Sequence, residues 1–430
     1  MLNLNTKLKQ LEESGKKINI GLVGAGQMGR GMTSQMLCMK GIRPTIISDI
    51  NLENAKKAYI LAGISPDDIE VAKTPAEAEE AFSRGKYIIT EDFEVVTRAL
   101  PVDVVIDATG VPEAGAQIAL ESIHNGKHIV MLNVETDVTV GPILKRMADS
   151  AGVVYTVSAG DEPGAIKELY DFADAMGFEV VVAGKGKNNP LNIDANPDTV
   201  REKAESQKMN PKMLASFVDG TKTMVEMTAV SNAIGFLPTK RGLIGPKASV
   251  KELPRLLSLK EEGGILERYK VVEYINGIAP GVFLIIRTNL ETVKEEMAYL
   301  SMGQGPNYVL YRPYHLASIE TPLSAARAYI YREPTIAPKG GPVSETVAVA
   351  KKDLKAGEHL DGIGGYTIYG IIDTYENAKK ENALPIGLVN KNVVLKKDVK
   401  KGETITYDAV ELDESSLILQ LRRMQEKLIK

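Results

Sequence analysis

The sequence GLVGAGQMGRGM at Gly21–Met32 is the strongest indication of the fold. An apolar run, Ile18–Val23, leads into it, and helix-compatible sequence follows directly. Glycines at 24, 26 and 29 match the G-x-G-x-x-G fingerprint of dinucleotide-binding βαβ units. There the first glycine permits a tight turn, the second lets a pyrophosphate approach the backbone, and the third lets helix pack on strand. The sequence therefore predicts a phosphate site at a helix start. The alternative is a glycine-capped turn without a ligand.

The next apolar run ends at Asp49, 25 residues after Gly24. A carboxylate at this point of a dinucleotide-binding unit meets the hydroxyls of the adenosine ribose. It would also repel a 2′-phosphate, and the sequence SDIN offers no arginine beside it. Lys56 and Lys57 lie one or two helical turns away. We therefore expect NAD as the cofactor and regard NADP as the less favoured alternative.

Short β-branched runs alternate with helical patterns from residue 18 to about residue 157. Such alternation predicts a doubly wound parallel sheet, whose ligands lie beyond the carboxyl ends of the strands. Two further runs end near polar residues, in DVVIDATG and MLNVETD. The predicted cofactor contacts are Gly24, Gly26, Gln27, Met28, Gly29, Asp49, Thr109, Gly110 and Asn133. Glu135 is predicted to face the same crevice and contact the substrate.

Composition bounds the function class. The 430 residues need two or three domains. A net charge of -4 argues against a nucleic-acid-binding surface. No apolar run approaches the length of a membrane span, and the N-terminus lacks a signal-peptide core, so we expect a cytoplasmic protein. The single cysteine, Cys38, is expected to be a small buried hydrophobe.

The rest of the chain predicts two further domains. Strand and helix patterns in the middle indicate an α+β substrate domain. A Pro/Gly cluster at Pro334–Pro342 marks a linker, and two similar phrases follow it, AKKDLKAGEHLD at Ala350–Asp361 and LKKDVKKGETIT at Leu395–Thr406. The C-terminal amphipathic helix is expected to pack or to oligomerise. The predicted boundaries are 1–160, 161–340 and 341–430.

Two lysines in GKGKNNP, Lys185 and Lys187, follow a strand. Cationic donors held close to a carbonyl can bind an anionic substrate or give a proton to the developing alkoxide. Asn188 belongs to the same turn and is expected to contact the substrate. The alternative is a solvated basic turn.

Two further motifs carry candidate residues. FVDGTKTMVEM places Asp219, Lys222 and Glu226 on one predicted helix face, and the alternative is a surface salt-bridge ladder. YRPYHL contains Arg312, which can bind phosphate or carboxylate, and His315, which can exchange a proton near neutral pH. Those two residues could equally form a structural pair.

Together with GDEPG, these motifs resemble the homoserine-dehydrogenase-like oxidoreductases that carry a C-terminal SAF domain. Within that group the chain resembles the 1-deoxy-D-xylulose 5-phosphate reductoisomerase-like proteins. The resemblance implies a Rossmann domain, a substrate domain that also mediates dimer contacts, and a C-terminal β module. It also implies an aspartate and a proton-relaying lysine near the reacting carbon, at Asp219 and Lys222. Related reductoisomerases use NADPH and a divalent metal, and Asp49 departs from that pattern.

The predicted function is an NAD(P)-dependent oxidoreductase for a small polar carbonyl or hydroxy compound bearing phosphate or carboxylate. Lys222, assisted by Lys185, is expected to deliver the proton, Lys187 to hold the substrate, and His315 to be the next candidate acid. Asp161 and Glu162, with Glu135, could hold a divalent metal, but no metal-site spacing supports this. The alternatives are an isomerase or epimerase that uses NAD transiently, and a non-catalytic NAD- or sugar-sensing module. A homodimer or higher homo-oligomer is expected.

Overall fold

The computed structural model describes residues 3–429 and divides into two compact units. The first comprises residues up to Gly164, with Leu316–Ala337 and the residues from Leu421. The second comprises Ala165–His315 and Pro338–Gln420. Most of the residues that follow the Pro/Gly cluster thus belong to the same unit as the middle of the chain. That the segment 341–430 folds as a separate third domain stays a prediction.

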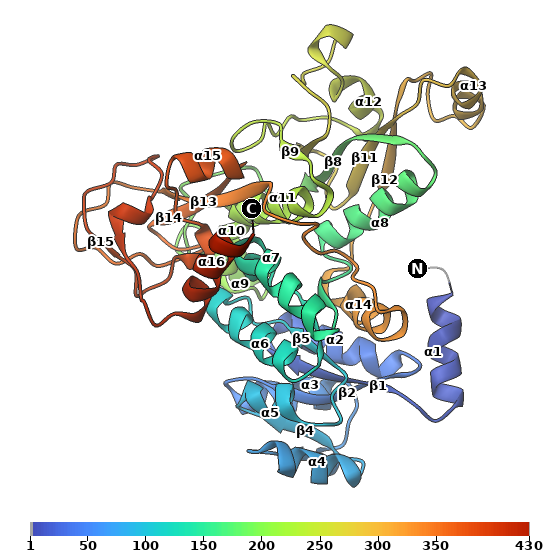
Figure 1. Cartoon of the computed structure of the whole chain (residues 1–430), viewed down its shortest axis with the longest axis vertical. Coiled ribbons are helices and arrows are strands. Elements are labelled where there is room, and N and C mark those ends of the chain that lie inside the picture. Colours follow the sequence, from blue (N-terminus) through green and yellow to red (C-terminus); the bar gives the residue numbers. More distant parts are fainter. Residues whose placement is uncertain (1–2, 430) are drawn as a thin grey trace. The chain divides into compact units, whose positions relative to one another are not determined.

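The first unit contains a seven-stranded parallel sheet in the order β3-β4-β2-β1-β5-β6-β7. Its strands are β1 Ile18–Val23, β2 Ile42–Ser48, β3 Ile69–Val71, β4 Tyr87–Thr90, β5 Val104–Asp107, β6 His128–Met131 and β7 Tyr155–Val157. Figure 1 labels β1, β2, β4 and β5 of this sheet. Central strands such as β5 are buried throughout, because helices cover both faces of the sheet. The predicted doubly wound sheet is confirmed, with the short edge strand β3 as an addition.

Helices cover the two faces in separate groups. On one face α14 packs on α1 and α2, and α2 packs on α3; on the other, α4 to α7 pack in sequence. The helices of this unit are α1 Leu4–Glu13, α2 Gln27–Cys38, α3 Leu52–Leu61, α4 Pro75–Ser83, α5 Phe93–Arg98, α6 Pro112–His124, α7 Val134–Ala151 and α14 Ala317–Tyr331. Cys38 is exposed at the last position of α2, so the expectation that it is buried is wrong: the apolar face of this helix is formed by Met32 and Met36 instead.

The second unit contains a mixed sheet in the order β12-β11-β8-β10-β9. Its strands are β8 Glu179–Lys187, β9 Leu237–Pro238, β10 Val271–Asn276, β11 Val282–Arg287 and β12 Asn307–Arg312. β8 lies at the centre, parallel to β10 and antiparallel to β11. This arrangement confirms the predicted α+β class for the middle of the chain.

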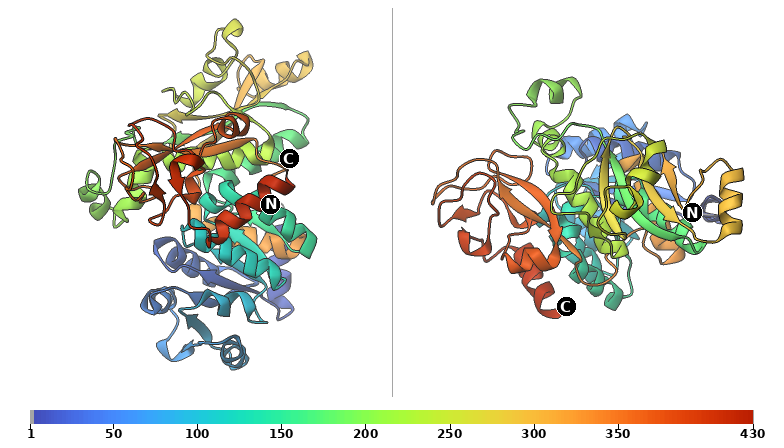
Figure 2. Two further views of the ribbon diagram at one scale, coloured as in Figure 1. Left: turned by 60° about the vertical axis from the view of Figure 1, so that its left-hand side comes forward. Right: turned by 90° about the horizontal axis from the view of Figure 1, so that it is seen from above.

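Helix α11, Thr221–Ile234, is buried along almost its whole length. It packs on β8, β9 and β10 on one side and on the antiparallel strands β13, Ser344–Ala350, and β14, Ile368–Thr374, on the other (Figures 1 and 2). The remaining elements of this unit are α9 Arg201–Ser206, α10 Pro211–Val218, α12 Leu253–Leu256, α13 Glu291–Tyr299, α15 Tyr375–Lys380, β15 Val394–Leu395 and β16 Val410–Glu411; α8 Glu162–Ala175 and α16 Leu417–Leu428 run across the two unit boundaries.

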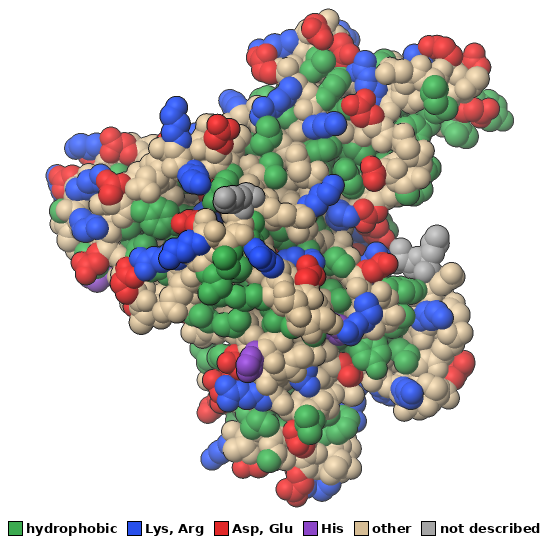
Figure 3. All heavy atoms as spheres, viewed as in Figure 1, with side chains coloured by type: hydrophobic (Ala, Val, Ile, Leu, Met, Phe, Trp, Pro, Cys, Tyr) green, Lys and Arg blue, Asp and Glu red, His purple; other side chains and the backbone are tan. Residues whose placement is uncertain are grey.

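The end of α16 packs on α7 in the first unit. Arg422 and Gln425 are buried there and bond to the backbone of α7. Beside this contact, side chains including Leu120, Met147 and Met424 line a hollow of about 490 Å³. Figure 3 shows hydrophobic side chains gathered over this region. The expected packing role of the C-terminal helix is confirmed. Among residues 3–429, no helix is long and apolar enough to cross a membrane.

Candidate active site

The glycine loop has the geometry that a dinucleotide requires. Gly24 has φ +100°, and a Cβ there would lie 2.7 Å from the carbonyl oxygen of Ala108. A Cβ at Gly29 would lie 2.1 Å from the Gly24 oxygen, so this glycine allows α2 to pack against the strand end. At Gly26 a Cβ would meet nothing within 4 Å, which leaves open space for a phosphate to approach. The three glycines thus fit their predicted roles.

Asp49 fixes the glycine loop from the end of β2. Its Oδ2 accepts a hydrogen bond from the backbone N–H of Ala25 at 2.8 Å. Its Oδ1 accepts from the Asn51 backbone at 2.9 Å and from the Asn54 side chain at 3.3 Å. These neighbours carry no positive charge, so this edge suits ribose hydroxyls better than a 2′-phosphate.

A second polar cluster forms where β5 ends. The buried Asp107 carboxylate accepts from the backbone and hydroxyl of Thr109, at 2.9 and 2.7 Å. Burial raises the pKa of Asp107 to about 6. The Asn133 amide donates to Val111 O at 3.0 Å, and its oxygen caps α7 by accepting from Thr136 N at 3.3 Å. Asn133 therefore positions the loop at this strand end.

The remaining predicted residues of this unit lie on the same elements. Gln27 and Gly110 are exposed and Met28 is half-buried, whereas Glu135 is buried in the first turn of α7. Asp161 and Glu162 lie just before and at the start of α8. The glycine loop, Asp49 and the strand end at Thr109 fit a bound NAD, with the pyrophosphate at the N-terminus of α2.

The second unit contains a buried pair of lysines on its central strand. Lys185 and Lys187 are two residues apart on β8, so their side chains leave the same face of the sheet. They are only 5% and 6% exposed. Lys185 forms an ion pair with the buried Glu226 of α11. The alternative of a solvated basic turn is therefore wrong for these two side chains, because α11 covers this face of the sheet.

Lys187 is the more unusual of the two lysines. Its ammonium donates to the carbonyl oxygen of Phe217 at 2.7 Å. Burial, followed by the charge of Lys185, lowers the pKa of Lys187 to about 8, although Asp219 and Glu226 act in the opposite direction. An ammonium with this pKa can release and regain a proton near neutral pH.

Asp219 does not lie on the helix that carries Lys222 and Glu226, and that prediction is wrong. Gly220 adopts φ +89° and separates α10 from α11, leaving Asp219 at the end of α10. The Asp219 carboxylate accepts from Thr221 N at 2.8 Å and pairs with Lys351 at 2.7 Å. Lys222 is half-buried in the first turn of α11.

The other predicted substrate residues have mixed surroundings. Asn188 is exposed beyond the end of β8. The Arg312 guanidinium lies 3.1 Å from the Glu168 carboxylate and stacks over the Tyr314 ring at 4.6 Å from its centroid. His315 is half-buried and follows β12 by three residues. Their contact with a substrate stays a prediction.

Sequence reasoning missed Lys351 and the role of Asp107. Lys351 lies in the first repeat phrase, where a dibasic turn gives no sign of burial. A comparison of the two repeat phrases could have drawn attention to Lys351. Lysines at equivalent positions of a repeat can have different surroundings, so each of them had to be considered separately. Asp107 ends a wholly apolar strand, and that position could have marked it as a buried carboxylate.

Family models match two consecutive parts of the chain. Residues 24–157 match the NAD-binding domain of homoserine dehydrogenase, and residues 160–321 match the catalytic domain of the oxidoreductase DRL. Both matches end before residue 341, so the resemblance of the C-terminal module to SAF domains stays a prediction, as does the likeness to the reductoisomerase-like proteins. Among curated proteins no match was found.

Solved structures give distant similarities. A probable dehydrogenase from Thermotoga maritima is 11% identical, with a TM-score of 0.41 over 74% of this chain and 90% of that chain. Scyllo-inositol dehydrogenase from Lactobacillus casei, solved with NAD(H) and scyllo-inositol, is 14% identical, with a TM-score of 0.38 over 69% and 76%. Levoglucosan dehydrogenase, solved with NADH and levoglucosan, is 15% identical, with a TM-score of 0.34 over 64% of each. Similarities at this level carry no inference about the substrate of this chain.

Proposed function

We propose that this NAD(P)-dependent oxidoreductase moves a hydride between NAD and a small polar carbonyl or hydroxy compound that carries a phosphate or carboxylate. The observation that carries the proposal is the buried lysine pair on β8. Both ammonium groups leave the same face of one strand and are buried, and Lys185 pairs with the carboxylate of Glu226. Two cations held together in this way favour an anionic or developing-anionic ligand. Asn188, Arg312 and His315 are proposed as further substrate contacts.

Lys187 is the proton donor that the geometry favours. Bound NADH would supply the hydride for reduction and become NAD⁺, and NAD⁺ would accept the hydride in the reverse direction. When a carbonyl is reduced, the Lys187 Nζ gives a proton to the developing alkoxide, and the Phe217 carbonyl holds that nitrogen in place. In the oxidative direction the neutral amine takes the proton from the hydroxyl group. The lowered pKa of Lys187 allows both roles near neutral pH.

Lys222 is the second candidate donor, on the resemblance to homoserine dehydrogenases. It lies four residues before Glu226 on α11, so the two share a helix face. Its greater exposure makes it less suited than Lys187 to transfer a proton away from water. Separate substitutions of the two lysines distinguish the assignments.

NAD is proposed over NADP because the carboxylate of Asp49 lies at the ribose edge of the loop, where Ala25, Asn51 and Asn54, which donate hydrogen bonds to it, are uncharged. The sequence matches to an NAD-binding domain and an oxidoreductase catalytic domain favour an enzyme over a non-catalytic sensor. An isomerase that uses NAD transiently would leave the NADH concentration unchanged over many turnovers.

The test is a screen of small phosphorylated and carboxylated carbonyl and hydroxy compounds. NADH absorbance and substrate loss are followed together, with and without Mg²⁺ or Mn²⁺. We expect stoichiometric consumption or formation of NADH with at least one compound. Substrate loss without net change in NADH would contradict the proposal and favour the isomerase. The mass of the protein in solution tests the proposed homo-oligomer.

A further inference from the structure

The two repeat phrases of the C-terminal segment pair with each other. Leu354 N donates to Val399 O at 2.8 Å, and Val399 N donates to Leu354 O at 3.0 Å. These residues occupy equivalent positions in the phrases at Ala350–Asp361 and Leu395–Thr406. The weak repeat in the sequence is therefore a real structural repeat, whose two copies are joined by an antiparallel bridge.

Reciprocal contacts of the two aspartates extend this pairing. Asp398 accepts from the backbone of Ala356 at 3.0 Å, and its equivalent, Asp353, accepts from the backbone of Lys401 at 2.9 Å. Each aspartate also pairs with a lysine of the opposite phrase, Asp398 with Lys355 and Asp353 with Lys400. The two phrases thus make the same contacts in both directions.

One pair of equivalent residues departs from this symmetry. Lys351 in the first phrase and Lys396 in the second each begin the dibasic turn. The Lys396 side chain is exposed, as expected for a lysine in a surface turn. The Lys351 side chain is only 3% exposed. A buried lysine is stable only when its charge is paired and its N–H groups are hydrogen-bonded. The burial of Lys351 therefore points to specific partners that Lys396 does not need.

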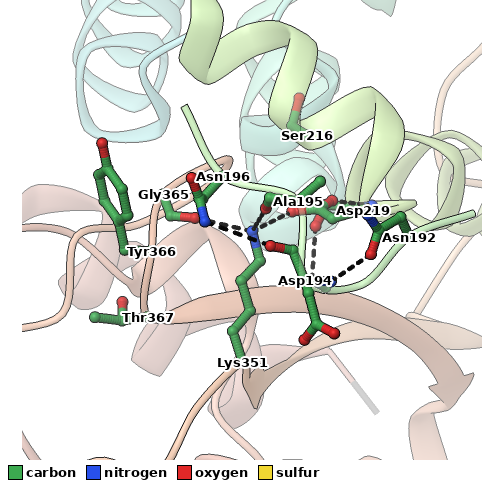
Figure 4. Close-up of polar contacts among 12 residues, drawn as sticks. Asn192, Asp194, Ala195, Asn196, Ser216, Asp219, Lys351, Gly365, Tyr366 and Thr367 are labelled. Carbon is green, nitrogen blue, oxygen red and sulfur yellow. Dashed lines mark hydrogen bonds and ion pairs between the residues drawn. The ribbon is translucent and has the colours of Figure 1, made fainter. Parts of the chain in front are cut away.

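The ammonium of Lys351 has three acceptors from three segments (Figure 4). It lies 2.7 Å from the carboxylate of Asp219, 2.6 Å from the carbonyl oxygen of Ala195 and 2.8 Å from that of Gly365. An ammonium has three N–H donors, so these contacts match its full capacity. Ala195 belongs to the loop that follows β8, and Asp219 joins α10 to α11.

We propose that Lys351 is a positioning residue of the active site: from the C-terminal repeat it holds Asp219 and the loop after β8 in the arrangement that surrounds Lys187. The proposal rests on the proposed function in that Lys187 is taken as the proton donor. A second contact supports it, because β14 also reaches the start of α11: Gly370 N donates to the Thr221 hydroxyl at 2.8 Å.

The link from Lys351 to Lys187 is electrostatic as well as steric. Four charged groups act on the Lys187 ammonium: Lys185 on the same strand, Asp219 at the α10–α11 junction, Glu226 on α11 and Lys203 on α9. Burial raises the pKa of Asp219, and the charge of Lys351 opposes this. Without Lys351, the buried Asp219 would take up a proton more readily, which would weaken its support for the charge on Lys187.

The test compares Lys351→Met with its repeat equivalent, Lys396→Met, in the full-length chain. Lysine-labelled protein is titrated by NMR, and the Lys187 signal is identified by its absence in Lys187→Met. We expect the titration of Lys187 to move to lower pH by about one pH unit in Lys351→Met. It should stay at its wild-type position in Lys396→Met. A folded Lys351→Met with an unchanged Lys187 titration overturns the proposal.

A second variant tests the proposal if Lys351→Met does not fold. The double variant Lys351→Met with Asp219→Asn removes both buried charges, and Lys187 should again titrate at lower pH than in the wild type. An unchanged titration in the folded double variant also overturns the proposal. The titration of Lys187 needs no substrate, so its outcome does not depend on whether the proposed reaction occurs. The proposed role of Lys187 as proton donor is tested separately and fails if Lys187→Met keeps the wild-type kcat.

Discussion

The carboxylate of Asp49 accepts a hydrogen bond from the backbone N–H of Ala25, joining the end of β2 to the glycine loop at 2.8 Å. The residue that is expected to bind the ribose therefore also shapes the phosphate loop. Replacing Asp49 should therefore weaken the binding of both NADH and NADPH. For this reason the cofactor preference is best measured as the ratio of the two dissociation constants.

Asp49→Ala should lower the affinity for NADH more than that for NADPH, because it removes the ribose acceptor and also the charge that repels a 2′-phosphate. Calorimetric titration of both cofactors gives the ratio of dissociation constants. Glu53→Ala, which removes an exposed carboxylate in the next helix, should leave this ratio unchanged. A wild-type preference for NADPH of about tenfold, or about 1.4 kcal/mol, would contradict the assignment of NAD.

Lys187→Met should reduce kcat by about 10²-fold or more, since the substitution keeps most of the side-chain length and removes the proton donor. The affinity for NADH should remain close to wild type, because the glycine loop is unaltered. Lys222→Met is the matched control and should retain most of the activity. If the two variants show the reverse order, Lys222 is the donor and Lys187 acts through substrate binding, which would appear mainly in KM.

The pH dependence of kcat should follow the ionisation of Lys187, whose pKa is lowered to about 8. Reduction needs the ammonium, so its rate should be constant below this pH and should fall as the pH rises through about 8. Oxidation needs the neutral amine and should show the opposite trend. Steady-state rates in both directions over this range provide the test. Parallel trends in the two directions would show that a different group titrates.

Much of the cofactor edge was predictable because its determinants are close in sequence. The glycines, the strand before them and the helix after them form one short segment, and the parallel sheet brings the ends of β2 and β5 to its edge. The prediction that Lys185 and Lys187 lie on a loop after the strand was wrong, because β8 extends to Lys187, and their two-residue spacing then directs both side chains to one face of the sheet.

The surroundings of Asp219 were not predictable in the same way. A helical pattern extends through FVDGTKTMVEM, but the left-handed conformation of Gly220 ends one helix before the next begins. The partner of Asp219 is Lys351, which directly follows β13, far away in the chain, and no local pattern connects the two residues. Tertiary packing therefore decides which of the candidate charges face each other.

Asp137 should make the first unit more stable at lower pH. It is buried, accepts a hydrogen bond from the Tyr155 hydroxyl at 2.9 Å, and burial raises its pKa to about 7. The unfolded-state pKa is about 3.9, so the native state binds more protons between these values and stability falls as the pH rises through them, by up to about 1.4 kcal/mol for each pH unit.

Asp137→Asn keeps the acceptor for Tyr155 and removes the buried charge. It should raise the free energy of unfolding at about pH 8 and reduce the difference between about pH 6 and pH 8. Denaturant titrations at both pH values measure this. Asp149→Asn, which alters an exposed carboxylate on the same helix, should have little effect. An equal pH dependence in wild type and Asp137→Asn would show that Asp137 is ionised in the native state at both pH values.

Gln425 should stabilise α7 at the point where proline interrupts it. Pro142 lies inside this helix, where it lacks an N–H and its ring distorts the preceding turn. The Gln425 side chain accepts from Ile143 N at 3.2 Å and donates to Thr139 O at 3.3 Å, and Arg422 also donates to Thr139 O, at 3.1 Å. The C-terminal helix thus supplies side-chain partners to the N–H of Ile143, which follows the proline, and to the carbonyl oxygen of Thr139 in the preceding turn.

Gln425→Ala should therefore lower the free energy of unfolding by about 1–3 kcal/mol, because the buried Ile143 N–H loses the acceptor that Gln425 provides. Gln420→Ala removes an exposed glutamine from the same helix, one whose side chain bonds only weakly to Glu414 O at 3.3 Å, and should change stability by less than about 0.5 kcal/mol. Chemical denaturation monitored by circular dichroism compares the two variants. Equal stabilities would show that α7 closes its own hydrogen bonds at Pro142 once Gln425 is absent, and the contact between α16 and α7 would then depend on its apolar side chains alone.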